Sequence, residues 1–159
     1  MLDLSKSGIW HFALTFYQMP GVEADCLEAQ DKFGLDVTAL IFALYRSTRE
    51  QGFDAGMAAE LARTMSARII EPLRAARSAL KAVPTLVDPT ANEALRQKVK
   101  VAELDAERLT LNALKALPIV GDALSAFASL AAIATASQVG DDPHLDVLLK
   151  RLAIAAQNM

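Results

Sequence analysis

Only a few side chains in this sequence have the types and spacing that catalysis requires. His11 and Cys26 fall in neighbouring predicted helices and could meet as a base and its nucleophile. Such a pair needs a thiol of lowered pKa and a third group that orients the imidazole. Cys26 instead falls in the middle of a predicted helix, on an apolar stripe, where a free cysteine usually behaves as a small hydrophobic residue. The sequence therefore favours a structural role for Cys26.

Two groups of acidic residues are suggestive of metal chemistry but lack the partners that it needs. Glu103 and Glu107 are four residues apart, so both carboxylates project from one helix face, and di-iron bundles bind metal through glutamates that project from several helices. Those bundles also use Glu-x-x-His pairs, and neither His11 nor His144 has a glutamate three residues before it. The run DDPHLD at 141–146 resembles the aspartate-rich magnesium–diphosphate motif of helical prenyl synthases, but no second such motif is present. We expect a solvated acidic face, a helix cap at the DDPHLD run, and no intrinsic metal or cofactor.

A basic row is the remaining candidate for polar chemistry. Arg74, Arg77 and Lys81 recur at helical spacing, on what we expect to be the outer face of a helix. This row could bind an anion or an acidic partner, or it could be solvated or pair with acidic residues of the next helix. The sequence contains no Gly-rich phosphate loop, G-x-S-x-G elbow, H-E-x-x-H pair or dinucleotide fingerprint. Without such a motif, the sequence favours a protein that is not an enzyme.

Composition restricts the class of protein. The chain has 159 residues, of which 53% are hydrophobic, and this predicts a single domain over 1–159 with a sizeable core. The net charge of -3 gives no positive field that would attract nucleic acid. A single cysteine and an N-terminus without a signal-peptide pattern fit the cytoplasm. The uncharged run 123–139 is shorter than the roughly 20 apolar residues of a membrane span, so we expect a buried helix there.

The segment 8–45 contains the only tryptophan, the only cysteine, both tyrosines and four of the six phenylalanines. Apolar residues at helical spacing predict helices at about 8–19, 22–33 and 37–45. Pro20 and Gly34 should end the first two, and Asp36 should cap the third. The third helix is apolar almost all round, so we place it at the centre of the core. The polar residues 46–52 should then form a solvated exit.

Proline, glycine and capping residues divide the rest of the chain. A helix should begin at an Asp54 cap and be kinked or restarted near Pro72, whose ring crowds the preceding turn and which lacks an N–H donor. Residues 84–90 contain two prolines and should turn a corner. A helix that opens at Gly121 and a last helix capped by Asp142 should follow. The expected inward rows are Met57, Leu61, Met65 and Ile69 with Ala58 and Ala62 alongside, then Leu73, Ala76, Leu80 and Val83, and finally Leu145, Leu148, Leu149, Leu152 and Ala156.

The longest predicted helix covers about 90–117. Its heptad-like row is typical of long antiparallel packing and consists of Leu95, Val99, Ala102, Ala106, Leu109, Ala113 and Ala116. In the predicted helix at 122–139, small residues at steps of four could serve an internal contact or a subunit contact. The sequence therefore predicts an all-α fold, a single-domain bundle of seven or eight helices.

Several short motifs of the N-terminal half resemble those of a known family. They are W-x-F-A-x-x-x-Y at Trp10 to Tyr17, P-G-V at Pro20 to Val22, C-L-x-x-Q-D at Cys26 to Asp31, and G-x-D-V at Gly34 to Val37. The segments EPLRAARSALK and VKVAELDAERL further along the chain add to this pattern. Over about residues 8–117 the chain thus resembles the domain-of-unknown-function 2390 family, a proteobacterial family of uncharacterised proteins. The resemblance implies no activity, cofactor or catalytic residue.

Gln30 and Asp31 are polar residues whose role the pattern leaves open between a structural tie and a ligand contact. The candidate ligand or partner residues are Trp10, Tyr17, Gln30, Asp31, Arg74, Arg77 and Lys81. We expect a non-catalytic cytoplasmic protein-interaction or accessory module, with an unidentified protein partner or a homodimer through the last three helices. The alternative is a small helical enzyme or a protein that binds an apolar ligand of lipid or isoprenoid type in a pocket lined by the first helix's aromatics. A solid core with an exposed apolar patch would favour the first.

Overall fold

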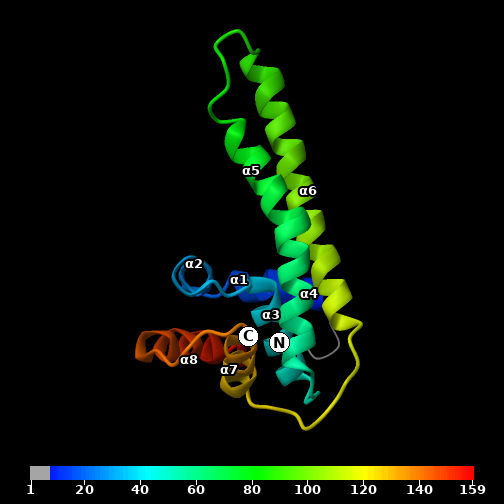
Figure 1. Ribbon diagram of the computed structural model, residues 1–159, viewed down its shortest axis with the longest axis vertical. Coiled ribbons are helices and arrows are strands. Elements are labelled where there is room, and N and C mark those ends of the chain that lie inside the picture. The colour runs from blue at the N-terminus through cyan, green and yellow to red at the C-terminus, as the bar shows by residue number, and fades with distance from the viewer. Residues whose placement is uncertain (1–7) are drawn as a thin grey trace.

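A computed structural model describes residues 8–159 of the chain, and its regular elements in this part are all helical (Figure 1). The elements are α1 (Ile9–Tyr17), α2 (Val22–Phe33), α3 (Val37–Thr48), α4 (Ala55–Met65), the π-helical turn η2 (Ser66–Ile70), α5 (Glu71–Ala79), α6 (Pro89–Lys115), α7 (Ala126–Ala136) and α8 (Pro143–Gln157). The predicted all-α fold class is confirmed.

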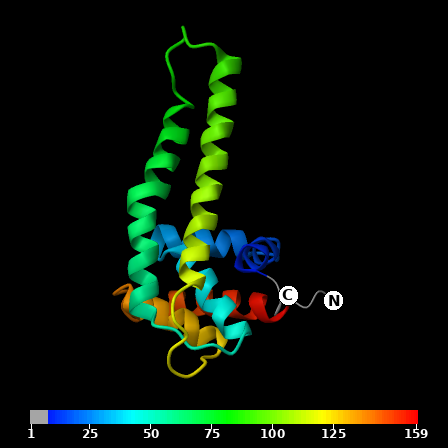
Figure 2. The same ribbon diagram turned by 90° about the vertical axis from the view of Figure 1, so that its right-hand side faces the viewer.

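The helices form a base and a projecting arm (Figures 1 and 2). The base consists of α1, α2, α3, α7 and α8. The arm consists of α4, η2 and α5, which follow one another without a loop, and of α6, which runs antiparallel to them. The upper part of the arm, residues 71–100, extends away from the base and ends in the loop between α5 and α6. We call residues 71–100 the distal arm.

Helix α3 lies at the centre of the core, as its apolar sequence predicted. Every side chain from Thr38 to Arg46 is buried, and the helix contacts α1, α4, α6, α7 and α8. The ring of Tyr45 packs edge-on against Phe12 at 5.7 Å between centroids. Burying an aromatic or aliphatic side chain of this size contributes about 1.5–3 kcal/mol, so α3 and its neighbours supply much of the apolar stabilisation.

The predicted helix ends in this core are confirmed at the atomic level. Gly34 takes the left-handed conformation (φ 66°) that lets a residue without a Cβ end α2. The Asp36 carboxylate accepts from the backbone N–H of Thr38 at 2.9 Å, and it caps α3. Asp54 and Asp142 cap α4 and α8 in the same way. The predicted inward row of α8 is buried at every position.

The predicted interruption at Pro72 takes the form of a π-helical turn. Since proline has no N–H, the carbonyl of Arg68 lacks its usual helical donor, and η2 widens the helix just before this point. Glu71 donates its N–H to the carbonyl of Ser66, five residues back. The predicted inward rows were partly wrong here. Met57 and Ile69 are exposed while Ala58 and Ala62 are buried, and α5 has no fully buried side chain.

The polar exit predicted after α3 was wrong for Arg46, which is only 2% exposed. Its guanidinium donates to the carbonyls of Gly52 (3.1 Å), Lys115 (3.3 Å) and Leu117 (2.5 Å), and it lies over the ring of Phe42. The last carbonyls of a helix lack intrahelical donors, so a buried cation is stabilised there without a carboxylate. Arg46 thereby ties the end of α3 to the end of α6.

Helix α7 is shorter than predicted. Gly121 is left-handed (φ 71°) but opens no helix, and α7 begins only after Ser125, which caps it. The preceding loop is held because the N–H of Val120 donates to the carbonyl of Gly52. Helix α7 packs against α3, α4 and α8, and its small residues Ala126, Ser129 and Ala134 are buried there. No helix in the described part of the chain is long and apolar enough to cross a membrane.

Helix α6 forms where the longest helix was predicted, but the residues of its predicted inward row are only partly buried. The fully buried side chains are Glu103, Ala106, Thr110, Leu111 and Leu114. Leu95 and Leu109 of the heptad-like row are 50% and 61% exposed. In the distal arm a single neighbouring helix faces α6, so only one side of it can be covered there.

Candidate functional site

Charged side chains from three helices gather where the arm leaves the base, and we call them the arm–base cluster: Asp36, Arg74, Arg77, Glu103 and Glu107. Glu103 is at its centre and is only 6% exposed. Its carboxylate accepts from Arg74 Nε at 3.1 Å and from Arg77 Nε at 2.7 Å. Burial alone would raise the pKa of Glu103, but the hydrogen bonds from Arg77 and Arg74 outweigh it and lower that pKa. Glu103 therefore clamps α5 to α6 as a buried carboxylate.

The other two carboxyl groups of the cluster have raised pKa values. Burial raises the pKa of Glu107, and the nearby Glu103 carboxylate adds to this, although Arg74 lies 3.8 Å away. Burial also raises the pKa of Asp36, which hydrogen bonds from Thr38 and the α3 backbone only partly offset. Three carboxyl groups thus face two guanidinium groups, and the cluster favours uptake of a proton.

Tyr17 and Cys26 lie beside the cluster, on α1 and α2. Burial raises the pKa of the Cys26 thiol to about 12, and that of the Tyr17 hydroxyl is raised by burial, by Cys26 and by Glu107. A thiol of such high pKa is a poor nucleophile. His11, the partner that the sequence suggested, is exposed on α1. The expected structural role of Cys26 fits its burial.

The arrangement of the cluster is that of a clamp. Glu103 occupies both guanidinium groups, so they do not form an open anion site. The sequence prediction that Glu103 belongs to a solvated acidic face was wrong, because Arg74 and Arg77 provide the charges that allow its burial. Arg74 and Arg77 pair with an acidic residue of the next helix, which was one of the outcomes expected for the basic row, although they face α6 and not the outer side of their helix. No group of three or more His, Cys, Asp or Glu residues within 8–159 could hold a metal ion.

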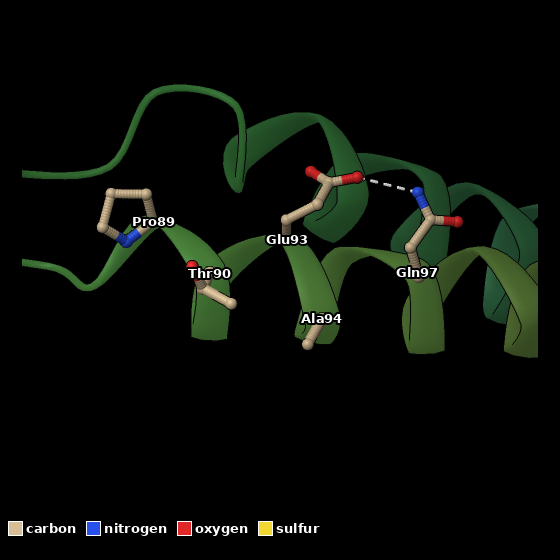
Figure 3. Close-up of a pocket in the computed structure, with 5 residues that line it drawn as sticks. All are labelled: Pro89, Thr90, Glu93, Ala94 and Gln97. Carbon is tan, nitrogen blue, oxygen red and sulfur yellow. Dashed lines mark hydrogen bonds between the residues drawn. The ribbon is translucent and has the colours of Figure 1, made fainter.

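Two surface pockets lie elsewhere. One is a shallow depression on α6 of about 410 Å³, lined by Pro89, Thr90, Glu93, Ala94 and Gln97, with Glu93 hydrogen-bonded to Gln97 (Figure 3). The other, of about 480 Å³, lies beside Tyr45, Arg46 and Lys115. Neither is lined by Phe12 or Phe16, because these α1 aromatics pack in the core.

The sequence of the arm and of part of the base has a counterpart among known protein families. The model of a protein family described as "Protein of unknown function (DUF2390)" matches residues 8–114. The chain belongs to the DUF2390 family. No curated protein and no solved structure matches it. The family match covers the arm and the whole arm–base cluster of this DUF2390 protein, and it ends before α7 and α8.

The remaining candidate residues of the DUF2390 chain are dispersed. Trp10 is half-buried on α1 and lies under the guanidinium of Arg108 at 5.7 Å. Gln30 is half-buried and Asp31 exposed, both on α2, and Lys81 is exposed beyond the end of α5. Of the candidates, the structure brings only Tyr17, Arg74 and Arg77 to the cluster.

Asp36, Glu103 and Glu107 were not among the candidates. Part of the signal was present in the sequence. Arg74 and Arg77 lie before the proline-containing loop and Glu103 lies after it, so a helical hairpin turning at that loop places a basic row and an acidic residue on its two neighbouring helices.

Proposed function

We propose that this DUF2390 protein is a non-catalytic interaction module that holds its arm out to a protein partner. One observation carries the proposal: the distal arm is a pair of helices with no third layer over it (Figures 1 and 2). Helix α5 has no fully buried side chain, and Leu86 in the loop at the tip is 98% exposed. Leu95, Val101 and Leu104 are exposed on α6.

Helices normally bury an apolar stripe against other elements, and two helices alone leave much of that surface in water. The base meets this requirement around α3, whereas the distal arm does not. The Glu103 ion pairs hold α5 and α6 together without a large apolar core. An arm of this kind is suited to present a fixed surface, to which a partner supplies the missing layer.

The alternative of an enzyme or an apolar-ligand protein has less support. Phe12 and Phe16, which that alternative assigned to a pocket, are buried and stacked with 6.2 Å between ring centroids. Cys26 is buried with a pKa of about 12. A filled core and an exposed apolar arm are the combination that we expected for an interaction module.

We further propose that the module is one domain and works in the cytoplasm, where its single cysteine stays reduced. This agrees with burial of that cysteine in the core.

Site-specific photo-crosslinking in the native host tests the proposed function. A photoreactive amino acid at Leu95 places the probe on the distal arm, and the same amino acid at the similarly exposed Ile154 of α8 is the matched control. We expect discrete protein adducts from the arm position and none from the control. Absence of adducts at both positions, or the same adducts at both, would refute the proposal.

A further inference from the structure

A row of apolar residues lies on the open side of α6. Leu95, Ala102 and Leu109 recur every seven residues, about 100° around the helix from the buried Glu103. Helices α4 and α5 pack against the side of α6 that carries Glu103. The side that carries the row stays open, so Leu95 and Leu109 are exposed and Ala102 is half-buried. Ala102 is the middle residue of α6 (Pro89–Lys115), so the row is centred on the helix.

Two charged residues lie beside this row with the same spacing. Lys98 and Asp105 are seven residues apart, and both are exposed. Neither takes part in the ion pairs of α6 that the described residues form, which join Arg74 to Glu103 and Glu107, Arg77 to Glu103, and Arg96 to Glu93. The open side of α6 thus carries a positive charge on one side of Ala102 and a negative charge on the other.

We propose that α6 packs against α6 of a second copy of this chain, antiparallel, about a two-fold axis at Ala102. This rests on the proposed function and names the partner of the arm. The two-fold axis sets Leu95 of each copy against Leu109 of the other. It also sets Lys98 of each copy against Asp105 of the other, so that both the apolar contact and the ion pair occur twice.

Charge selects the antiparallel direction. A parallel pair in register would set Lys98 against Lys98 and Asp105 against Asp105, which is unfavourable. The wider distribution agrees, since residues 71–100 contain six basic and three acidic side chains, whereas the rest of the chain contains ten basic and sixteen acidic. In the antiparallel pair, the basic distal arm of each copy lies beside the acidic part of the other. The small side chain of Ala102 allows the two helices to approach closely at the axis.

The same symmetry accounts for exposed residues at both ends of the arm. The 27 residues of α6 span roughly 40 Å, so the tip of each arm reaches the end of α6 in the other copy. The tip carries Leu86, and the loop after α6 carries the exposed Ile119 and Val120. These apolar side chains become neighbours in the pair and shield one another from water.

Charge reversal tests the proposal by sedimentation velocity of the purified full chain. We expect a dimer in the micromolar range, and about tenfold weaker association for Lys98→Glu or Asp105→Lys alone, because each puts two like-charge pairs at the interface. The double variant should recover the wild-type affinity. Leu104→Glu, on the opposite side of α6, is the control and should leave association unchanged. A chain that stays monomeric at high-micromolar concentration, or a double variant weaker than both single ones, would overturn the proposal.

Disulfide trapping tests the position of the axis. Ala102→Cys should give a disulfide-linked dimer on its own, because the two copies of residue 102 meet at the axis. Leu95→Cys alone should not, but a mixture with the Leu109→Cys chain should. Efficient trapping of Leu95→Cys alone would indicate a parallel pair and contradict the proposal. Circular dichroism of each variant confirms that it is folded.

The two proposals can fail separately. If the purified chain stays monomeric but crosslinking at Leu95 yields a different protein, the second-copy proposal fails and the interaction module stands. If crosslinking at Leu95 yields no adduct with this chain or with any other protein, both fail.

Discussion

Arg46 offers the sharpest test of how the arm is attached to the base. We predict that Arg46→Met destabilises the fold, because it removes the guanidinium donors from the partly buried carbonyls of Lys115 and Leu117 and leaves the Gly52 carbonyl with the N–H of Val120. Methionine has similar length and can fill much of the space, so the change isolates the loss of the guanidinium. The cation–π contact with Phe42 is lost as well.

The expected loss follows from two opposed effects. Each buried carbonyl left without a donor costs about 1–3 kcal/mol. Removal of the charge recovers part of the free energy that burying the guanidinium costs. The same burial lowers the pKa of Arg46. With two partly buried carbonyls left without this donor and the Gly52 carbonyl left with one, we expect a net loss of about 2–4 kcal/mol in the free energy of unfolding. For a chain of this length that corresponds to a fall of about 10 °C in Tm.

Urea unfolding followed by far-UV circular dichroism measures this loss directly. Arg46→Lys should recover only part of the stability, because one ammonium group cannot reach all the carbonyls that the planar guanidinium reaches. Arg63→Met removes an exposed ion pair of α4 with Glu60 and should cost under about 0.5 kcal/mol. A loss below about 1 kcal/mol for Arg46→Met, with an unchanged m value, would refute the reasoning.

Four further outcomes follow from the described contacts. Gly52→Ala should cost about 3 kcal/mol or more in urea unfolding, because its Cβ would lie 2.3 Å from a carbonyl oxygen of the loop after α6; wild-type stability would contradict this. Glu103→Ala should cost about 1–3 kcal/mol and speed hydrogen exchange in the distal arm, since it leaves two partly exposed arginines without their shared carboxylate; unchanged exchange would argue against the clamp. The raised pKa of Glu107 contributes stability below the ordinary value of 4.5, and this contribution is lost as pH rises through the folded pKa. Matched urea titrations should therefore find Glu107→Gln more stable than the wild type at pH 7 and equal to it below pH 4.5. A stability difference between the two chains that grows toward acid pH would contradict this sign. Cys26 should react with a thiol reagent at mildly alkaline pH only after unfolding, and fast labelling of the native chain would contradict its burial.

Local chemistry made part of this fold predictable. The caps at Asp36, Asp54 and Asp142 depend on a side chain and the N–H groups two or three residues later, so a single sequence contains both partners. The all-round apolar run of α3 predicted its central position for a similar reason. A helix without a polar face has no side that can be left in water.

The burial of Arg46 and Glu103 could not be predicted in this way, because their partners are distant in the sequence. Arg46 depends on carbonyls about seventy residues later, and a backbone carbonyl leaves no trace in residue type. Glu103 depends on two arginines of another helix, and only the register of the hairpin shows that they meet it. The exposure of Leu95 likewise follows from how far the arm projects, which the heptad spacing alone does not determine.

The π-helical turn makes the arm tolerant of a change in chain length at a single point. Such a turn arises when one extra residue is accommodated within an α-helix. Deletion of one residue from Ser66–Ile70 would restore regular winding and leave α5 in its present orientation relative to α4, because the wider turn absorbs that residue. Deletion of one residue from the regular winding of α4 would instead rotate α5 by about 100° and turn Arg74 and Arg77 away from Glu103. The η2 turn is therefore a point of the arm at which the chain length can change by one residue while the arginine–glutamate pairing is kept.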